Sequence, residues 1–409
     1  EKFLVRYSKQ GMPLSMDKLD AYYGLFLDLS DEDLNKDLFI VAQIYRYGKF
    51  KLVLLDNNSK KAPVFKYRRP WGCAGSNLYH SLENLTPSSS TNNQNFIHYS
   101  CVDAESNMTS LHESLIKKAQ NPQKSLLPDK SDRNNFGMAI SLRMLRGDLP
   151  TVKTESPILF TKDVAIAQRL GFSDTVVNPG EVRNDLYLTI NCAEFDRGTK
   201  KSAKNVEIDI SVFDINGVII PDCINCGCGE SNKTVYNTSV FYHQNSPKWN
   251  DIIRLSIPID KFTGAHIRLD FYHCSTRDKN EKKLQGFSYL CLTGKDSSTV
   301  YDGQHELCIY KCDDIKKIKD YKNLPMYQDE LNDIQKSAAT PLPFQRNSKE
   351  YCLVSTLLCS TKFTQNTGLL SVLQWSMNRD KISDNLRNLI RLRSQEIVKY
   401  LQDILDALF

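Results

Sequence analysis

The most regular feature of the sequence is an alternation of apolar and polar residues in short runs between positions 186 and 312. In one run Val206, Ile208 and Ile210 alternate with Glu207 and Asp209. A period of two is typical of a β-strand with one face in a core and the other in water. Similar runs occupy residues 186–190, 205–213, 234–242, 251–259, 266–273, 286–293 and 305–312. Short strands at this spacing predict an antiparallel β-sandwich.

A less regular, β-rich pattern precedes the sandwich. The runs 25–29, 38–45 and 50–55 are rich in strand-forming residues, and the polar residues 56–61 predict a turn. Two stretches, near 85–95 and 117–135, have few apolar residues, and we expect them to be mobile loops. A short helix is expected over 163–170, with Gly171 as its stop.

After the sandwich the pattern changes from β to helical. A polar tract at 328–350 contains Pro341 and Pro343 and predicts a linker. A helix is expected at 369–375, and the apolar spacing over 397–408 predicts a helix with one face packed against a neighbour. This pattern indicates the first turns of a helical repeat domain that continues beyond Phe409.

The chain is therefore expected to be mainly β with some α structure, in four parts. These are a β-rich region at 1–180, a sandwich at 181–327, a linker at 328–350 and the beginning of a helical repeat domain at 351–409. The sequence starts at Glu1 rather than at a methionine and ends within a helical pattern. We therefore expect it to be a piece of a longer protein.

Composition narrows the class of protein. The 53 basic and 48 acidic residues give a net charge of +5, which is too balanced for a protein that coats nucleic acid. A basic and aromatic stretch, with Lys66, Arg68, Arg69 and Trp71, is compatible with single-stranded nucleic acid, but its brevity and place beside a strand favour a structural role. Apolar runs are too short to span a bilayer, so we expect a soluble protein.

The twelve cysteines lie mostly in apolar runs, which indicates reduced thiols in an intracellular protein. Cys223, Cys226 and Cys228 have a spacing compatible with zinc, for which His243 is the nearest further ligand. A structural zinc needs four closed ligands, so a glycine-containing loop with incidental cysteines is the favoured interpretation. The seven histidines are expected at the surface or at strand ends. No catalytic residue, metal site or cofactor is predicted.

Two lysine-rich loops are the most informative charged features. One follows the first strand of the sandwich and the other follows the strand that ends at His273. They contain Arg197, Lys200, Lys201 and Lys204 in the first, and Arg277, Lys279, Lys282 and Lys283 in the second. Loops at one end of a sandwich converge, so the two could form one positive cup for an anionic ligand. The alternative is that both are merely solvated, lysine-rich turns.

Several motifs resemble one family along nearly the whole chain. The segment 181–190, Asn245-Ser-Pro-Lys-Trp249, and 266–276 with 278–283 resemble the first homology region of DOCK proteins. Arg68-Arg-Pro-Trp-Gly72 and 169–172 are similar to the region upstream of it. The segments 358–362, 364–366 and 401–409 are similar to the start of the helical repeats downstream. The subgroup that the chain resembles is the Rac-activating one that works with ELMO-type adaptors.

The resemblance implies a specific function. In DOCK proteins the first homology region is a C2-type domain that binds phosphatidylinositol 3,4,5-trisphosphate without calcium, and armadillo-like repeats follow it. The loops here carry lysines where calcium-binding C2 domains carry aspartates. By position, the implied headgroup residues are Lys200, Lys201, Lys204, Arg277, Lys279, Lys282 and Lys283, together with Arg197 and His273.

The resemblance also implies how the whole protein acts. Nucleotide exchange on a Rac-type GTPase and binding of an ELMO-type adaptor belong to other parts of the protein, so this chain is expected to be non-catalytic. The protein is expected in the cytoplasm and, after recruitment by the lipid, at the plasma membrane, where it would serve actin remodelling in migration, cell fusion or engulfment. The competing hypothesis is a purely architectural scaffold that binds no lipid.

Overall fold

The computed structural model describes the sandwich, most of the C-terminal helices and separate portions of the N-terminal region. The described residues are 2–8, 23–27, 29, 33, 38–48, 67–78, 94–98, 100–101, 108, 113–114, 116–117, 137–161, 164–170, 182–196, 204–274, 282–294, 298–330, 343–373, 375, 382–392 and 394–409.

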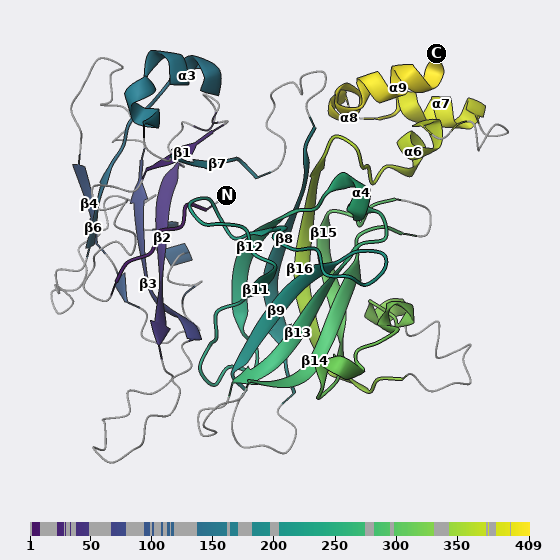
Figure 1. Ribbon diagram of the computed structural model, residues 1–409, viewed down its shortest axis with the longest axis horizontal. Coiled ribbons are helices and arrows are strands. Elements are labelled where there is room, and N and C mark those ends of the chain that lie inside the picture. Colours follow the sequence, from purple (N-terminus) through teal and green to yellow (C-terminus); the bar gives the residue numbers. More distant parts are fainter. Residues whose placement is uncertain are drawn as a thin grey trace.

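Strands dominate the described part of the chain, and helices gather at its C-terminal end (Figure 1). The N-terminal elements are β1 (Gly24–Phe26), β2 (Phe39–Gly48), β3 (Tyr67–Asn77), β4 (Gln94–His98), β5 (Ser100–Cys101), β6 (Gly137–Ser141), α3 (Leu149–Glu155), η4 (Pro157–Phe160) and β7 (Ala165–Ala167). The sandwich elements are β8 (Asn184–Glu194), β9 (Val206–Phe213), β10 (Ile224–Asn225), β11 (Val235–Asn237), β12 (Lys248–Ser256), α4 (Ile259–Phe262), β13 (His266–Cys274), β14 (Lys282–Cys291), β15 (Gly303–Lys311), η5 (Ile315–Lys317), η6 (Tyr321–Asn323) and β16 (Arg346–Ser360). The helices α6 (Thr367–Leu373), α7 (Ile382–Ile390), α8 (Ser394–Lys399) and α9 (Leu401–Leu408) follow.

The sandwich strands run in the order β10-β12-β8-β16-β15-β14-β13-β9-β11, and adjacent strands are antiparallel. The pairing between β14 and β15 is limited to Gly286 with Lys311 and Phe287 with Tyr310. Because so little pairing joins them, the sheet turns there and its two halves form two layers (Figure 1). The core fills the space between the layers.

The predicted alternation explains this core. Val206, Ile208, Ile210 and Val212 all point into the main hydrophobic cluster, where they meet the inward residues of β8, β12, β13 and β16. Fully burying one such side chain contributes about 1.5–3 kcal/mol. The prediction of a mainly β fold with an antiparallel sandwich is confirmed.

The outer face of the sheet was expected to lie in water, but part of it is buried. Glu207 and Ser211 on that face are each 6% exposed. A second hydrophobic cluster covers β14 and β15. In it, Ile318, Tyr321 and Leu324 from the segment after β15 pack in one cluster with Phe287. The alternation therefore identifies one core but not the second, which forms only when residues 312–330 fold back over the strands.

The predicted boundary at Tyr327 is wrong, because the sandwich continues to Ser360. Residues 346–360 form the 15-residue strand β16, which lies between β8 and β15 in the middle of a layer. The predicted linker therefore ends in this strand, and the first residues assigned to the helical repeat belong to the sandwich. β16 resembles a boundary in sequence because its first residues, Arg346 to Glu350, are all polar.

Two of the histidines expected at the surface or at strand ends lie at or near the starts of β13 and β15, and both are buried. His266 is 1% exposed and its Nε2 lies 2.6 Å from the hydroxyl of Tyr321, while His305 is fully buried beside Tyr327 and Thr356. Burial, with Lys322 and Arg268 nearby, lowers the pKa of His266 from 6.5 to about 4. The imidazole is therefore neutral in the folded protein at physiological pH.

The buried His266 predicts a loss of stability in mild acid. Between pH 6.5 and about 4 the unfolded chain takes up a proton at this histidine and the folded chain does not, so the free energy of unfolding falls as the pH falls. At about 1.4 kcal/mol per pH unit, the full loss is about 3 kcal/mol. Urea unfolding at stepped pH should give a flatter profile for His266→Gln than for the wild type. Identical profiles would contradict this assignment.

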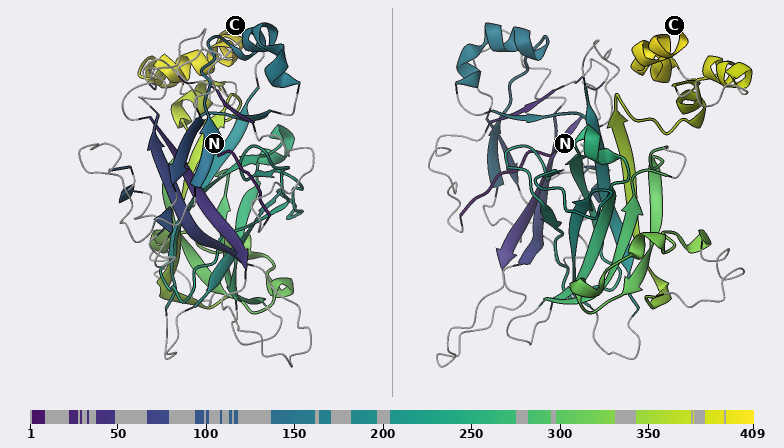
Figure 2. Two further views of the ribbon diagram at one scale, coloured as in Figure 1. Left: turned by 90° about the vertical axis from the view of Figure 1, so that its left-hand side faces the viewer. Right: turned by 45° about the vertical axis from the view of Figure 1, so that its right-hand side comes forward.

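The N-terminal region packs beside the sandwich (Figure 2). β2 pairs along its whole length with β3, which confirms the strand expected at 38–45. The helix expected over 163–170 is wrong: residues 165–167 are the strand β7, which pairs in parallel with β1. The predicted strand at 50–55 and turn at 56–61 lie outside the described residues, as do the predicted loops except for 94–95 of β4 and Lys117.

The C-terminal helices contact the end of β16. α6 confirms the helix expected near 369–375, while the apolar stripe at 397–408 is divided between α8 and α9, which meet at Tyr400. The Tyr400 side chain is 1% exposed, and its hydroxyl donates to the carbonyls of Ser360 and Phe363. Among the described helices, none is long and apolar enough to cross a membrane.

Candidate functional site

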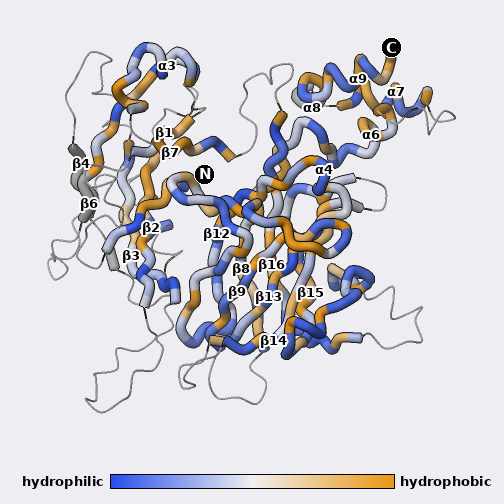
Figure 3. Tube along the Cα trace, viewed as in Figure 1, coloured by the Kyte–Doolittle hydropathy of each residue, from blue (hydrophilic) through white to orange (hydrophobic). Residues whose placement is uncertain are grey.

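The strand register brings the two predicted basic loops to the same end of the sandwich. β8 ends at Glu194 and β9 begins at Val206, whereas β13 ends at Cys274 and β14 begins at Lys282. His273 pairs with Val206, and the backbone amide of Cys274 donates to the carbonyl of Asn205 at 2.8 Å. The first connection therefore ends beside the point where the second begins. We call this the basic end, and in Figure 3 hydrophilic segments gather there, at the bottom of the view.

A buried carboxylate holds the two sides of the first loop together. Glu350 Oε1 accepts hydrogen bonds from the backbone amide of Asp196 and from Lys204 Nζ, each at 3.1 Å. Its second oxygen accepts from Lys311. The Glu350 side chain is 2% exposed, so this charge is removed from water and compensated by two ammonium groups.

A second buried carboxylate does the same for the second loop. Glu207 accepts from Lys282 Nζ at 2.8 Å and from the thiol of Cys274 at 3.6 Å. Asp209 Oδ1 lies 3.9 Å from the same ammonium. Burial raises the pKa of Glu207 and Lys282 opposes that rise. Burial disfavours the Lys282 charge, but Glu207 and Asp209 outweigh it and raise the pKa of the amine, which is charged at neutral pH.

The remaining predicted residues divide into two groups. Lys283 is exposed, next to the half-buried Lys282, and His273 is half-buried at the end of β13. The other five candidates lie outside the described residues: Arg197, Lys200, Lys201, Arg277 and Lys279. The structure therefore brings Lys204, Lys282, Lys283 and His273 to one end of the sandwich. It also adds Glu350 and Glu207, which sequence reasoning placed in a linker and on a wet strand face.

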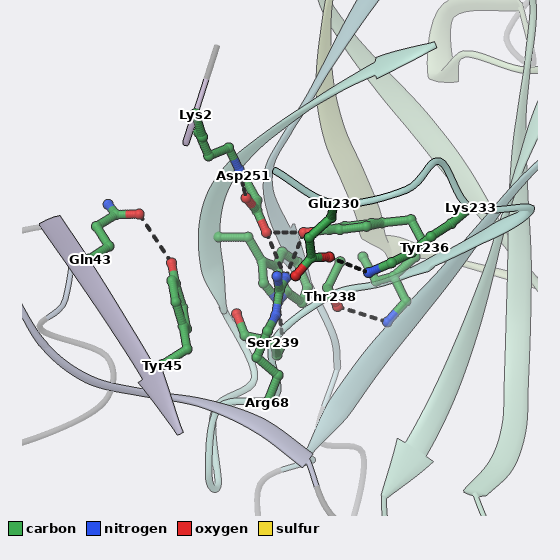
Figure 4. Close-up of polar contacts among 12 residues, drawn as sticks. Lys2, Gln43, Tyr45, Arg68, Glu230, Lys233, Tyr236, Thr238, Ser239 and Asp251 are labelled. Carbon is green, nitrogen blue, oxygen red and sulfur yellow. Dashed lines mark hydrogen bonds and ion pairs between the residues drawn. The ribbon is translucent and has the colours of Figure 1, made fainter. Parts of the chain in front are cut away.

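A third buried carboxylate joins the N-terminal region to the sandwich. Asp251 of β12 is 7% exposed and accepts from Lys2, from the hydroxyl of Tyr236 and from Arg68 Nη2, the last at 2.7 Å (Figure 4). Burial alone would raise the pKa of Asp251, but Lys2 and Arg68 hold it well below its usual value. The basic stretch 66–71 thus has a structural role at Arg68, as the sequence favoured.

The cysteine and glycine motif at 223–229 forms part of the same contact. Residues 2–4 run beside it, with Leu4 N donating to Cys228 O at 2.9 Å and Cys228 N donating to Lys2 O at 2.8 Å. A Cβ on Gly227 would lie 2.7 Å from the Lys2 carbonyl, so the close approach requires glycine. Within the described part of the chain, no three histidine, cysteine, aspartate or glutamate side chains gather as a metal site.

Comparison with known proteins identifies the family. The family described as "C2 domain in Dock180 and Zizimin proteins" matches residues 179–368, and "DOCK N-terminus" matches residues 1–62 and 54–173. The matched range 179–368 includes β16, in agreement with its place in the sandwich. Together the two families account for nearly all of the chain up to α6.

Individual relatives match over the full length of the chain. "Dedicator of cytokinesis protein 3" of Homo sapiens is 42% identical over 412 residues, and "Dedicator of cytokinesis protein 4" of Mus musculus is 39% identical over 414 residues. The chain covers 20% of the length of each. Among solved structures, a C2 domain of plant Extended Synaptotagmin 1 is 10% identical with a TM-score of 0.26, over 44% of this chain and 97% of that one.

The resemblance seen in the motifs is therefore confirmed by matches that run through both the N-terminal region and the sandwich. The chain belongs to the DOCK family and contains its N-terminal region and its C2 domain.

Proposed function

We propose that this chain is a non-catalytic, membrane-recruiting segment of a DOCK-family guanine-nucleotide exchange factor for a Rac-type GTPase. Its C2 domain binds the headgroup of phosphatidylinositol 3,4,5-trisphosphate, without calcium, at the basic end. The observation that carries this proposal is the register of β9, β13 and β14, which brings two lysine-rich connections to one end of the sandwich. Each cation close to an anionic membrane contributes about 1 kcal/mol, so converging lysines support binding despite a balanced net charge.

Recruitment from the cytoplasm to the plasma membrane follows from this proposal. The exchange reaction on a Rac-type GTPase and the contact with an ELMO-type adaptor are assigned to other parts of the longer protein. As part of the proposal, the recruited exchange factor serves actin remodelling in migration, cell fusion or engulfment.

Sedimentation with vesicles tests the proposal. The wild-type chain should bind phosphatidylcholine vesicles that contain a few per cent of the trisphosphate lipid, bind plain vesicles weakly, and behave alike with calcium or a chelator. A triple variant, Lys200→Glu, Lys201→Glu and Lys283→Glu, should lose at least about 100-fold in affinity, because three favourable charges become repulsive. Lys282 is left intact because it pairs with Glu207.

A matched triple variant controls for net charge. Lys153, Lys261 and Lys322 are exposed and lie outside the basic end, so their change to glutamate alters net charge equally. This variant should keep most of the affinity and of its sensitivity to salt. Equal losses in the two triple variants would show that binding follows overall charge and would refute a site at the basic end.

A purely architectural scaffold is the second candidate function. It is favoured by the contacts of Asp251 with Lys2 and Arg68, and of Tyr400 with Phe363, which join the sandwich to the regions on either side of it. If the wild-type chain shows no preference for the trisphosphate vesicles, the scaffold function is the one to retain.

A further inference from the structure

In each basic loop, the two ends bind the same buried carboxylate. Asp196 and Lys204 are the described residues on either side of the first loop, and Glu350 Oε1 binds both. Cys274 and Lys282 are the described residues on either side of the second loop, and Glu207 binds both. Each loop therefore has one buried carboxylate that contacts its incoming and its outgoing end.

Further contacts fix Asp196 and Lys204, the two ends of the first loop. Asn347, three residues before Glu350, donates from Nδ2 to Asp196 Oδ2 at 2.9 Å. The backbone amide of Lys204 donates to Asn245 Oδ1 at 2.9 Å, and its ammonium lies 5.6 Å from the centre of the Phe195 ring. Lys204 is therefore held at its backbone and at its charge, and its side chain is only 17% exposed.

At the second loop, a residue of the N-terminal region packs against Cys274. Tyr67 of β3 packs in one cluster with Val240 and Cys274, the residue whose thiol donates to Glu207. On the other side, Asn205 Nδ2 donates to the Cys274 carbonyl at 3.0 Å. Lys282 is 28% exposed and directed to Glu207, whereas the next residue, Lys283, is exposed.

We propose that Glu350 and Glu207 are positioning residues of the headgroup site and that Lys204 and Lys282 fasten the loop ends instead of binding phosphate. This inference rests on the proposed function. A lysine that turned toward a phosphate would leave a buried carboxylate without its partner, which is strongly unfavourable. Loop ends held in place lower the conformational entropy lost when the headgroup binds. Among the described lysines of the basic end, Lys283 is then the one that binds phosphate.

The two possible roles of Glu350 predict opposite changes in affinity for trisphosphate vesicles when its carboxylate is removed. Glu350→Ala and Glu350→Gln each make the basic end more positive by one charge, and charge alone would tighten binding to an anionic vesicle about fivefold in both. If Glu350 positions the loop ends, both variants should bind more weakly than the wild type, and Glu350→Ala should bind more weakly than Glu350→Gln. Glutamine keeps an acceptor for Asp196, while alanine keeps none, so we expect Glu350→Ala to lose about tenfold.

The test uses the whole 409-residue chain and trisphosphate vesicles, with the thermal midpoint of every variant measured in parallel. Val354→Ala is the control for a merely structural effect, because Val354 is buried in the core of the same strand. It should lower the thermal midpoint and leave affinity unchanged well below that midpoint. Lys204→Arg preserves the ion pair and should keep the wild-type affinity. The Glu207→Gln and Glu207→Ala pair should repeat the order found at Glu350.

The outcomes separate the two proposals. Binding by the wild type together with equal or tighter binding by Glu350→Ala would overturn the positioning role and leave the headgroup site intact. A loss of affinity in Val354→Ala that matches the loss in Glu350→Ala would also overturn it, since stability alone would then explain the effect. Absence of any preference of the wild type for trisphosphate vesicles would reject the proposed function and, with it, this inference.

Discussion

A chain that ends at Tyr327 is expected to fail to fold its sandwich, whereas a chain that ends at Gly368 should fold. The shorter chain lacks β16, which pairs with β8 on one side and with β15 on the other. Its loss removes the buried side chains of Cys352, Val354 and Leu358 and leaves two strand edges open in the middle of a layer.

The expected loss of free energy of unfolding is comparable to the whole stability of an ordinary domain. Each buried aliphatic side chain contributes about 1.5–3 kcal/mol, and domains are stable by only about 5–15 kcal/mol. Near-ultraviolet circular dichroism and thermal unfolding of residues 1–327, 1–368 and 1–409 would measure it. The chain 1–368 controls for the absence of helices α6 to α9. A cooperative transition of normal amplitude in 1–327 would show that β16 is dispensable.

Arg68→Ala is expected to destabilise the folded chain by about 3–5 kcal/mol, the usual effect of removing one partner from a buried ion pair. Arg68 is the only described arginine that contacts Asp251, and its Nη2 also binds the hydroxyl of Tyr236. Without it the buried carboxylate keeps Lys2 and Tyr236 but loses much of the charge that offsets its desolvation. Urea unfolding at neutral pH measures the loss.

Two further variants make the interpretation specific. Arg46 lies on the neighbouring strand β2 and is exposed, so Arg46→Ala should change stability by less than about 0.5 kcal/mol. The double variant Arg68→Met, Asp251→Leu removes both charges and should recover part of the loss, because a buried pair can often be replaced by apolar residues. If Arg68→Ala costs no more than Arg46→Ala, the contact between the two regions does not depend on this ion pair.

These contacts matter for the proposed function because the loops at the basic end depend on residues from distant parts of the chain. Tyr67 from the N-terminal region packs against Cys274, and Glu350 from β16 holds Lys204. A fragment that begins after β3 therefore loses the Tyr67 contact at the second loop, and a fragment that ends before Glu350 loses the Glu350 contact at the first loop. Lipid-binding experiments on fragments should include residues 1–368 for this reason.

The sequence by itself determined the strands of the sandwich and the family. Alternation at Val206, Ile208 and Ile210 reports the buried face of β9, because burial of every second side chain is a local property of an extended chain. The motifs around Trp249 and His266 identified the DOCK family for a similar reason: they are contiguous in sequence. The positions of the two basic loops also followed, since they lie between predicted strands.

Only the tertiary structure decided which charges are free and which are paired. Lys204 and Glu350 are 146 positions apart, and Lys2 and Asp251 are 249 apart, so no local pattern connects them. The polar start of β16 resembles a linker because four of its five residues are half-buried or exposed, while the residues that follow are placed between β8 and β15. Periodicity records whether a side chain faces the core, but the partner of a buried charge is set by contacts between distant segments, and these exist only in the folded chain.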